Sequence, residues 1–301
     1  MDPVVGEGPS GRREMPAASF RRKVAIIDSK VTVPRLSDDV IDRPRVQQSL
    51  AGLIRTSRAV LVTATAGAGK TTAVASAAAL VGPPTAWLTV DRTDTAPGRL
   101  VTYLEAALAR ALPDVLGVAT GAVGLGIPHA EAAGLLAESI GDRPLVFVMD
   151  ELERLGNERD AWAAIEAFIR YLPEAASVVL ISRRDIPEAH PGLPPAMKVA
   201  GFGERDLAFT LEEAGEALAR VGKAEVDAGV AVNATGGWVT GVLFEAWRSA
   251  EHMVGAGGEA DPLYGYLSSQ ILATLDPQDC DFLVRTSLLD EVNAPRAEAW
   301  A

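Results

Sequence analysis

The feature that most constrains this chain is a glycine-containing turn between an apolar run and a helical run. Residues 59–62 are apolar and short enough for a buried strand, and residues 64–69 are all small. Lys70 and Thr71 follow, and residues 71–80 have the alanine-rich pattern of a helix. Strand, glycine turn and helix in that order are the context of a phosphate-binding loop. The stretch therefore predicts an α/β fold with a parallel sheet and helices on both faces.

The chemistry of such a loop assigns a role to each of its residues. Successive backbone N–H groups must turn toward an anion, which requires residues without bulk at Gly67 and Gly69. The amine of Lys70 is expected to contact the β- and γ-phosphates, and the hydroxyl of Thr71 to bind Mg²⁺. The helix N-terminus adds partial positive charge beneath the phosphates. The candidate cofactor-binding residues of the loop are Ala66, Gly67, Ala68, Gly69, Lys70, Thr71 and Thr72.

One position departs from the general pattern. The pattern begins with glycine six residues before the lysine, where this chain has Ala64. Alanine is the least costly replacement, provided that its φ angle is negative. The alternative interpretation is a turn of small residues that only packs a helix on a sheet. The preceding strand, the Lys-Thr-Thr run and the following helix favour the phosphate loop over that alternative.

A second motif carries two adjacent carboxylates. The apolar run 145–149 predicts a buried strand, and Asp150 and Glu151 follow where it ends. Ligands of open parallel sheets bind at the carboxyl ends of the strands, which places both residues near the phosphates. Asp150 is expected to hold Mg²⁺, directly or through water, and Glu151 to polarise an attacking water. The alternative is an ordinary strand end that reaches solvent. Roughly 80 residues after a phosphate loop, the pattern favours a Walker B element.

Two arginines complete the candidate site. Arg183 follows a further predicted strand, residues 177–182, and a positive charge at the end of that strand can sense a γ-phosphate. Glu151 and Arg183 are thus the candidate catalytic residues. Arg43 lies in an extended segment just before a predicted helix, residues 47–54, where chains commonly wrap the nucleotide base. For both arginines the alternative is a solvated side chain.

The remaining pattern predicts further strands and helices around these motifs. Additional strands are expected at 85–90 and 202–209, helices at 100–111, 130–140, 159–172 and 277–286, short helices from 210 to 248, and a loop at 117–128. The spacing also places Asp94 or Thr95 as a cap of the helix that follows them.

Composition excludes several classes of protein. A net charge of −12 argues against nucleic-acid binding over the whole surface. The single cysteine, Cys280, excludes an intrachain disulfide and a cysteine-ligated zinc site. No apolar stretch approaches the roughly 18 residues of a membrane span, and the N-terminus lacks the apolar core of a secretion signal. We therefore expect a cytoplasmic protein without a membrane partner.

Taken as an ordered set, these motifs resemble the nucleotide-binding core of STAND-class signal-transduction ATPases. More narrowly, they are similar to the large ATP-binding LuxR-type transcriptional regulators, the group that includes the maltose regulon activator. The set consists of Ser29-Lys30, 40–45, 65–72, 87–91, 147–151, 168–173, 179–183, 207–210, Gly237-Trp238 and Tyr266-Leu267. The phosphate loop alone would be unspecific, but the order and spacing of the set are specific.

The resemblance implies a division of the chain and a function. It implies an N-terminal tail (1–23), an ATPase domain (24–200), a helical domain (201–258) and the beginning of a winged-helix domain (259–301). ATP or ADP with Mg²⁺ is expected between the first two folded domains, with slow hydrolysis controlling domain packing and self-association in the ATP state. The alternatives are a turnover ATPase of the AAA+ kind and a nucleotide-stabilised scaffold without hydrolysis.

Full members of this group continue into a sensor domain of helical repeats and a C-terminal helix-turn-helix. This sequence contains neither, which leaves open whether it is a fragment or a complete protein. A regulatory ligand or protein is therefore expected to act through such a missing region. Direct, specific DNA binding is not expected of these residues.

Overall fold

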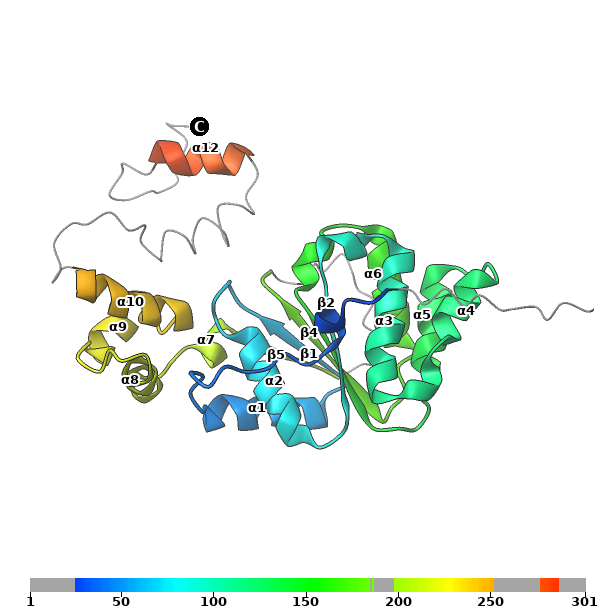
Figure 1. The fold of residues 1–301 in the computed structure, drawn as a ribbon, viewed down its shortest axis with the longest axis horizontal. Helices are drawn as coiled ribbons and strands as arrows, with labels where there is room; N and C mark the ends of the chain where they lie inside the picture. Colours follow the sequence, from blue (N-terminus) through cyan, green and yellow to red (C-terminus); the bar gives the residue numbers. More distant parts are fainter. Residues whose placement is uncertain (1–24, 185, 187–197, 252–276, 287–301) are drawn as a thin grey trace, which may run out of the picture.

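The computed structural model describes residues 25–184, 186, 198–251 and 277–286, and its centre is a five-stranded parallel sheet (Figure 1). The strand order is β2-β3-β4-β1-β5, with every pair parallel. The strands are β1 (Ala59–Thr63), β2 (Thr85–Thr89), β3 (Leu145–Asp150), β4 (Ala176–Ser182) and β5 (Val199–Gly203). The predicted parallel α/β fold is confirmed.

Helices cover both faces of the sheet (Figure 1). One face is covered by α1 (Pro44–Thr56) and α2 (Lys70–Val81). On the other face lie α3 (Pro97–Ala111), α5 (His129–Glu138) and α6 (Arg159–Arg170), and α4 (Val118–Gly124) packs on α3 and α5. Short 3₁₀ turns connect these elements: η1 (Asp28–Val31), η2 (Arg92–Thr95), η3 (Pro113–Val115) and η4 (Leu152–Leu155).

The two-residue period of a strand distributes its side chains between the two layers. In β3, Phe147 packs toward α6, where its ring lies 4.9 Å from the ring of Phe168. Its neighbours Val146 and Val148 point to the opposite face and join the core beneath α1 and α2. Because both faces are covered, the strand is apolar without interruption, as is typical of parallel sheets.

Beyond β5 the chain forms a small helical unit, which we define as α8 (Leu211–Arg220), α9 (Ala228–Thr235) and α10 (Val239–Glu251). The short helix α7 (Glu204–Leu207) connects it to the sheet, and α12 (Pro277–Thr286) follows later in the chain. The unit has its own apolar core, to which Phe209 and Ile41 also contribute. Ile41 comes from the N-terminal segment 25–43, here called the strap, so this segment joins the two parts.

The structure corrects three local predictions. The glycine-rich stretch 117–128 is not simply a loop, because it contains α4. The buried carboxylate of Glu105 accepts hydrogen bonds from the N-terminal N–H groups of that helix. Residues 202–209 are not one strand, because β5 ends at Gly203 and α7 follows. Neither Asp94 nor Thr95 caps α3, whose N-cap residue is Ala96; Asp94 is instead buried beside Lys30.

Other predictions lie partly or wholly outside the described residues. These are the N-terminal tail 1–23 and most of the region 259–301; within the latter the predicted helix Pro277–Thr286 is described and confirmed. β5 continues past residue 200, where the boundary of the ATPase domain was expected. Among the described residues, no helix combines the length and the apolar character that a membrane span requires.

Candidate nucleotide-binding site

The register of the sheet brings the candidate residues to one edge. Thr63 of β1 is aligned with Ser182 of β4 and with Gly203 of β5, and Asp150 of β3 is aligned with Thr89 of β2. The phosphate loop follows Thr63, and Arg183 follows Ser182. Because β4 lies between β1 and β3, Arg183 emerges between the loop and the two carboxylates. The three predicted motifs thus meet in one cavity, lined by residues 66, 67, 69–72, 150, 151, 153 and 183.

The backbone of the loop explains its sequence. Gly67 and Gly69 have φ angles of 74° and 83°, which side chains other than that of glycine rarely adopt. In the described part of the chain, Glu151 is the only residue other than glycine that has a positive φ angle. The φ angle of Ala64 is therefore not positive, which is the condition under which alanine can replace the first glycine of the pattern.

Lys70 is buried at the start of α2, and its amine is held by the loop itself. The Nζ atom donates to the carbonyl oxygens of Ala64 at 2.7 Å and Thr65 at 2.8 Å. Burial lowers the pKa of this amine, and the nearby carboxylate of Glu153 acts in the opposite direction. A cation held inside a loop with inward amides is suited to an anionic ligand.

Asp150 and Thr71 form the part of the site that fits a divalent cation. The Thr71 hydroxyl donates to Asp150 Oδ2 at 2.8 Å, and the Asp150 side chain is buried. Burial raises the pKa of Asp150 to about 6, although the hydrogen bond from Thr71 lowers it. A hydroxyl and a carboxylate beside a phosphate pocket are hard oxygen donors, which Mg²⁺ prefers. These residues therefore fit a nucleotide with Mg²⁺.

Glu151 and Arg183 lie in contact, as part of a larger charged group. Arg183 is 3.4 Å from Glu151 Oε1 and 3.0 Å from Glu153 Oε1. Arg154 donates to the other oxygen of Glu151 at 2.9 Å. Sequence reasoning missed Glu153 and Arg154, since their approach depends on the turn η4 directly after β3. The only signal in the sequence was their position within four residues of Asp150.

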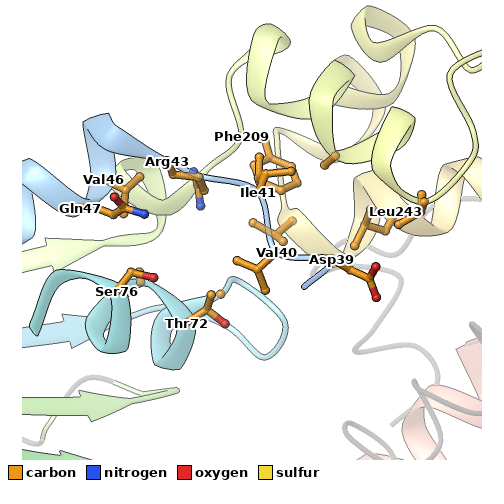
Figure 2. Close-up of a pocket in the computed structure, with 15 residues that line it drawn as sticks. Asp39, Val40, Ile41, Arg43, Val46, Gln47, Thr72, Ser76, Phe209 and Leu243 are labelled. Atoms are coloured by element: carbon orange, nitrogen blue, oxygen red, sulfur yellow. The ribbon is translucent and has the colours of Figure 1, made fainter. Parts of the chain in front are cut away.

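A second, largely apolar cavity of about 240 Å³ adjoins the phosphate pocket. It lies between α2, the strap and the helical unit, with Val40 at its centre in the close-up (Figure 2). Its walls include Ile41, Phe209, Val221, Val239 and Leu243. Gly69 and Thr72 line both cavities. A single ligand with an anionic end and a flat apolar end would fit the two.

Arg43 lines this second cavity, but its guanidinium is largely engaged by the chain. Its Nη2 atom donates to the carbonyl oxygens of Leu207 and Ala208 and to Glu213 Oε2, at 2.8, 3.1 and 2.9 Å. It also lies over the ring of Phe209, 4.8 Å from the centroid. Arg43 therefore fixes the strap and α1 to the start of the helical unit, and contributes one wall of the pocket (Figure 2).

Sequence comparison relates this geometry to known proteins. The chain is 27% identical over 286 residues to the HTH-type transcriptional regulator MalT of Yersinia enterocolitica. It is 28% identical over 285 residues to MalT of Klebsiella pneumoniae. It is homologous to MalT. The alignments cover 89% of this chain and 31% of each relative, and MalT of Serratia proteamaculans is 29% identical over a similar span. No protein-family model matches the chain.

The resemblance to ATP-binding LuxR-type regulators is thereby confirmed. The chain spans about a third of the length of these relatives, namely 31%. Among solved structures, it is similar to a Walker-type ATPase of Pyrococcus abyssi, with a TM-score of 0.47, 14% identity and coverage of 87% of this chain and 88% of that one. It is also similar to the Orc1 protein of Aeropyrum pernix, solved in complex with DNA, with a TM-score of 0.46, 17% identity and coverage of 84% and 73%.

Proposed function

We propose that this chain binds ATP and ADP between the sheet and the helical unit, and acts as the nucleotide-dependent switch module of a transcriptional regulator. The observation that carries the proposal is the pair of adjoining cavities that share Gly69 and Thr72. One cavity has the amides, the lysine and the carboxylates that phosphates with Mg²⁺ require. The other has the apolar walls that a purine base requires.

Each residue of the phosphate cavity has a role in this proposal. Lys70 would pair with the β- and γ-phosphates, and Thr71 and Asp150 would hold Mg²⁺. The bound cation would neutralise phosphate charge and orient the γ-phosphate. Glu151 would orient a water, and Arg183 would lie at the γ-phosphate. Both are paired with neighbouring charges, which supports slow hydrolysis rather than rapid turnover.

The proposal of a switch is supported by the base pocket, whose walls come from different parts of the chain. The base pocket takes Val40 and Ile41 from the strap, Ser76 from α2, and Val221 and Leu243 from the helical unit. A ligand that contacts both parts changes the free energy of their packing, so it can shift the population of packed arrangements. We include self-association in the ATP state, a cytoplasmic location and control by a sensor outside these residues in the proposal. The domain division at 24–200, 201–258 and 259–301 also belongs to it.

Calorimetry with a matched lysine pair tests the binding site. The wild-type chain should bind ADP and ATP, and Lys70→Ala should abolish both without a loss of folding, because the cation that faces the phosphates is gone. Lys198→Ala is the control, since Lys198 is exposed and precedes β5 at the opposite end of the sheet. Unchanged nucleotide binding by Lys70→Ala would show that the site has been assigned wrongly.

A nucleotide panel tests the specificity and the type of activity. ATP should outcompete GTP at equal concentration, an expectation that rests on the homology to MalT rather than on the lining residues. Steady-state hydrolysis should be slow and should fall further in Glu151→Gln. Rapid turnover would favour a mechanical ATPase, and turnover unaffected by Glu151→Gln would favour a nucleotide-stabilised scaffold.

A further inference from the structure

The helical unit contacts the phosphate loop through hydrogen bonds to the loop's own carbonyl groups. The indole Nε1 of Trp238 donates to the carbonyl oxygen of Ala66 at 2.9 Å. Thr240 donates twice to the carbonyl oxygen of Gly67, from its hydroxyl at 2.8 Å and from its backbone N–H at 3.2 Å. Trp238 immediately precedes α10, and Thr240 lies in its first turn. Trp238 and Thr240 thus hold two successive peptide groups of the loop, those that begin at the carbonyls of Ala66 and Gly67.

The geometry of a peptide group converts these outer contacts into an effect on the inner side of the loop. In a trans peptide the C=O and the following N–H point in opposite directions. A carbonyl of Ala66 that is held outward therefore turns the N–H of Gly67 inward. The same holds for the carbonyl of Gly67 and the N–H of Ala68. The Ala68 N–H indeed donates across the loop, to the carbonyl oxygen of Thr65 at 3.4 Å.

The contacts on the other side of the loop limit which amides are available. The N–H of Thr65 points away from the cavity to Glu204, whose carboxylate also accepts from the Thr65 hydroxyl. The N–H groups that can face an anion therefore begin after Thr65. Those of Gly67 and Ala68 are the ones whose direction depends on Trp238 and Thr240.

A glycine places the two donors. Gly237 has a φ angle of 78°, and a Cβ atom there would lie 2.7 Å from the carbonyl oxygen of Phe209. The lack of a side chain lets Gly237 accept a hydrogen bond from the N–H of Phe209 at 2.8 Å. Phe209 in turn lines the base pocket (Figure 2). The segment that carries Trp238 is therefore fixed to a wall of the pocket that would hold the base.

We propose that Trp238 and Thr240 are positioning residues, which orient the anion-binding amides of the phosphate loop without touching the nucleotide. The inference rests on the proposed function and adds a regulatory consequence. Full affinity for the phosphates requires the helical unit to be docked on the loop. Undocking of α10 would release the loop carbonyls and weaken the hold on the phosphates, and it would also remove Val239 and Leu243 from the base pocket. Loss of a single donor at Trp238 or Thr240 would instead affect the phosphates and leave the walls of the base pocket in place.

The test separates affinity for the phosphates from affinity for the base. Thr240→Val removes the hydroxyl donor but keeps the shape of the side chain and the backbone N–H, and Thr240→Ser keeps the hydroxyl. Trp238→Phe removes the indole donor. Affinity for ADP is measured by calorimetry, and affinity for adenosine by competition with a fluorescent ADP analogue. Thr210→Ala is the control, because Thr210 caps α8 without contacting the loop.

We expect Thr240→Val and Trp238→Phe each to weaken ADP binding about tenfold, the effect of one good hydrogen bond. Adenosine affinity should change less than twofold, and Thr240→Ser and Thr210→Ala should bind ADP as the wild type does. Should one variant fail to fold, the other carries the test.

Two results would overturn the positioning role while leaving nucleotide binding intact. One is unchanged ADP affinity in both Thr240→Val and Trp238→Phe. The other is an equal loss for ADP and adenosine, which would indicate a general effect on the pocket. A wild-type chain that binds no ADP would instead overturn the proposed function, and the positioning role with it.

Discussion

Asp150 and Glu151 are adjacent carboxylates with different surroundings, and the difference assigns them different roles. Asp150 is 3% exposed and accepts from Thr71, which suits a cation held against the loop. Glu151 has a φ angle of 58°, in a region that costs a non-glycine residue roughly 1 kcal/mol or more. That conformation directs its carboxylate between Arg154 and Arg183 rather than onto Thr71.

Asp150→Asn should therefore abolish the effect of Mg²⁺ on ATP binding. The amide can still accept from Thr71, but it supplies no negative charge to the cation. We expect the ratio of ATP affinities measured with Mg²⁺ and with EDTA to fall to about one, while the affinity in EDTA changes little. Calorimetry in the two buffers measures this ratio. A variant that loses affinity equally in both buffers would argue against a metal role for Asp150.

Residues of local motifs could be predicted from the sequence, and residues brought in by turns could not. Lys70 and Thr71 lie within one turn of the glycines, so their spacing alone places them at a phosphate. Glu153 reaches Arg183 only because Glu151 adopts a left-handed conformation and η4 follows. Nothing in the pattern of side chains indicated that conformation, since it usually favours glycine.

At the scale of elements, the strap is anchored by a buried ion pair. Lys30 of η1 is 7% exposed and contacts Asp91 at 2.9 Å and the fully buried Asp94. Its amine also lies 4.2 Å from the centroid of the Tyr103 ring. The strap then continues to Val40 and Ile41 in the base pocket. Its beginning is therefore fixed to the end of β2 and its far end borders the pocket.

Lys30→Met should destabilise the chain by about 3 kcal/mol, because removing one partner leaves a buried carboxylate without its main cation. Arg99, 3.4 Å from Asp94 Oδ1, compensates in part. Urea unfolding of the variant measures the loss, with Lys198→Met as the exposed control. A midpoint equal to that of the wild type would show that the pair contributes nothing net.

The link between α1 and the helical unit should depend on pH through Glu213. Partial burial acts to raise the pKa of Glu213, but hydrogen bonds from Arg43 and Arg45 outweigh it, so the pKa lies below the ordinary value of 4.5. The carboxylate therefore stabilises the folded chain above pH 4.5, and this contribution is lost as the pH falls below that value.

Glu213→Gln should lower the free energy of unfolding by about 2 kcal/mol at pH 7, the worth of hydrogen bonds to a charged group. The difference from the wild type should shrink as the pH falls below 4.5. Urea unfolding at a series of pH values measures both free energies. A difference that stays constant with pH would mean that the charge of Glu213 is not what stabilises this contact.

The type of most elements could be predicted, but their ends and the short helices could not. The strand 145–149 is an uninterrupted apolar run and the helix 159–172 has a strong helical period, and the structure confirms both elements. In α4 the sequence is mostly glycine, alanine and valine, with little amphipathic pattern. That helix depends on the distant Glu105, a tertiary contact that periodicity cannot reveal.

At the scale of the whole molecule, the decisive feature is the contact between the sheet and the helical unit. The sequence contained its parts, since Gly237-Trp238 and the Arg43 segment belonged to the motif set. It did not indicate which contacts each would make. Arg43 lines the base pocket and Trp238 contacts the phosphate loop, although the two lie almost 200 residues apart and on different elements. Arg43, Arg45 and Arg220 all donate across this contact, so the predicted pocket is assembled by long-range bonds.

The whole chain should not bind DNA in a sequence-specific way. Its net charge is −12, and phosphate contacts require clustered cations that displace counterions. In the described C-terminal helix α12 the basic residue is Arg285, which pairs with Asp281 at 2.7 Å. A recognition helix requires polar and basic side chains aimed at the base edges, and α12 offers one arginine already paired with an acid. Any specific DNA contact of a longer protein should therefore come from residues outside this chain.

Gel shifts over a salt series measure the DNA binding of the chain. They compare a specific duplex, taken from a promoter bound by a MalT relative, with a scrambled duplex. We expect no difference between the duplexes, and only weak binding at low salt that disappears near physiological ionic strength. The basic pairs and triplet of the first 23 residues, Arg12-Arg13 and Arg21-Arg22-Lys23, are the expected source of such weak binding. Replacing these five residues with serine should remove it. Sequence-dependent binding that persists at physiological salt, and survives those replacements, would place a DNA-binding surface elsewhere on the chain.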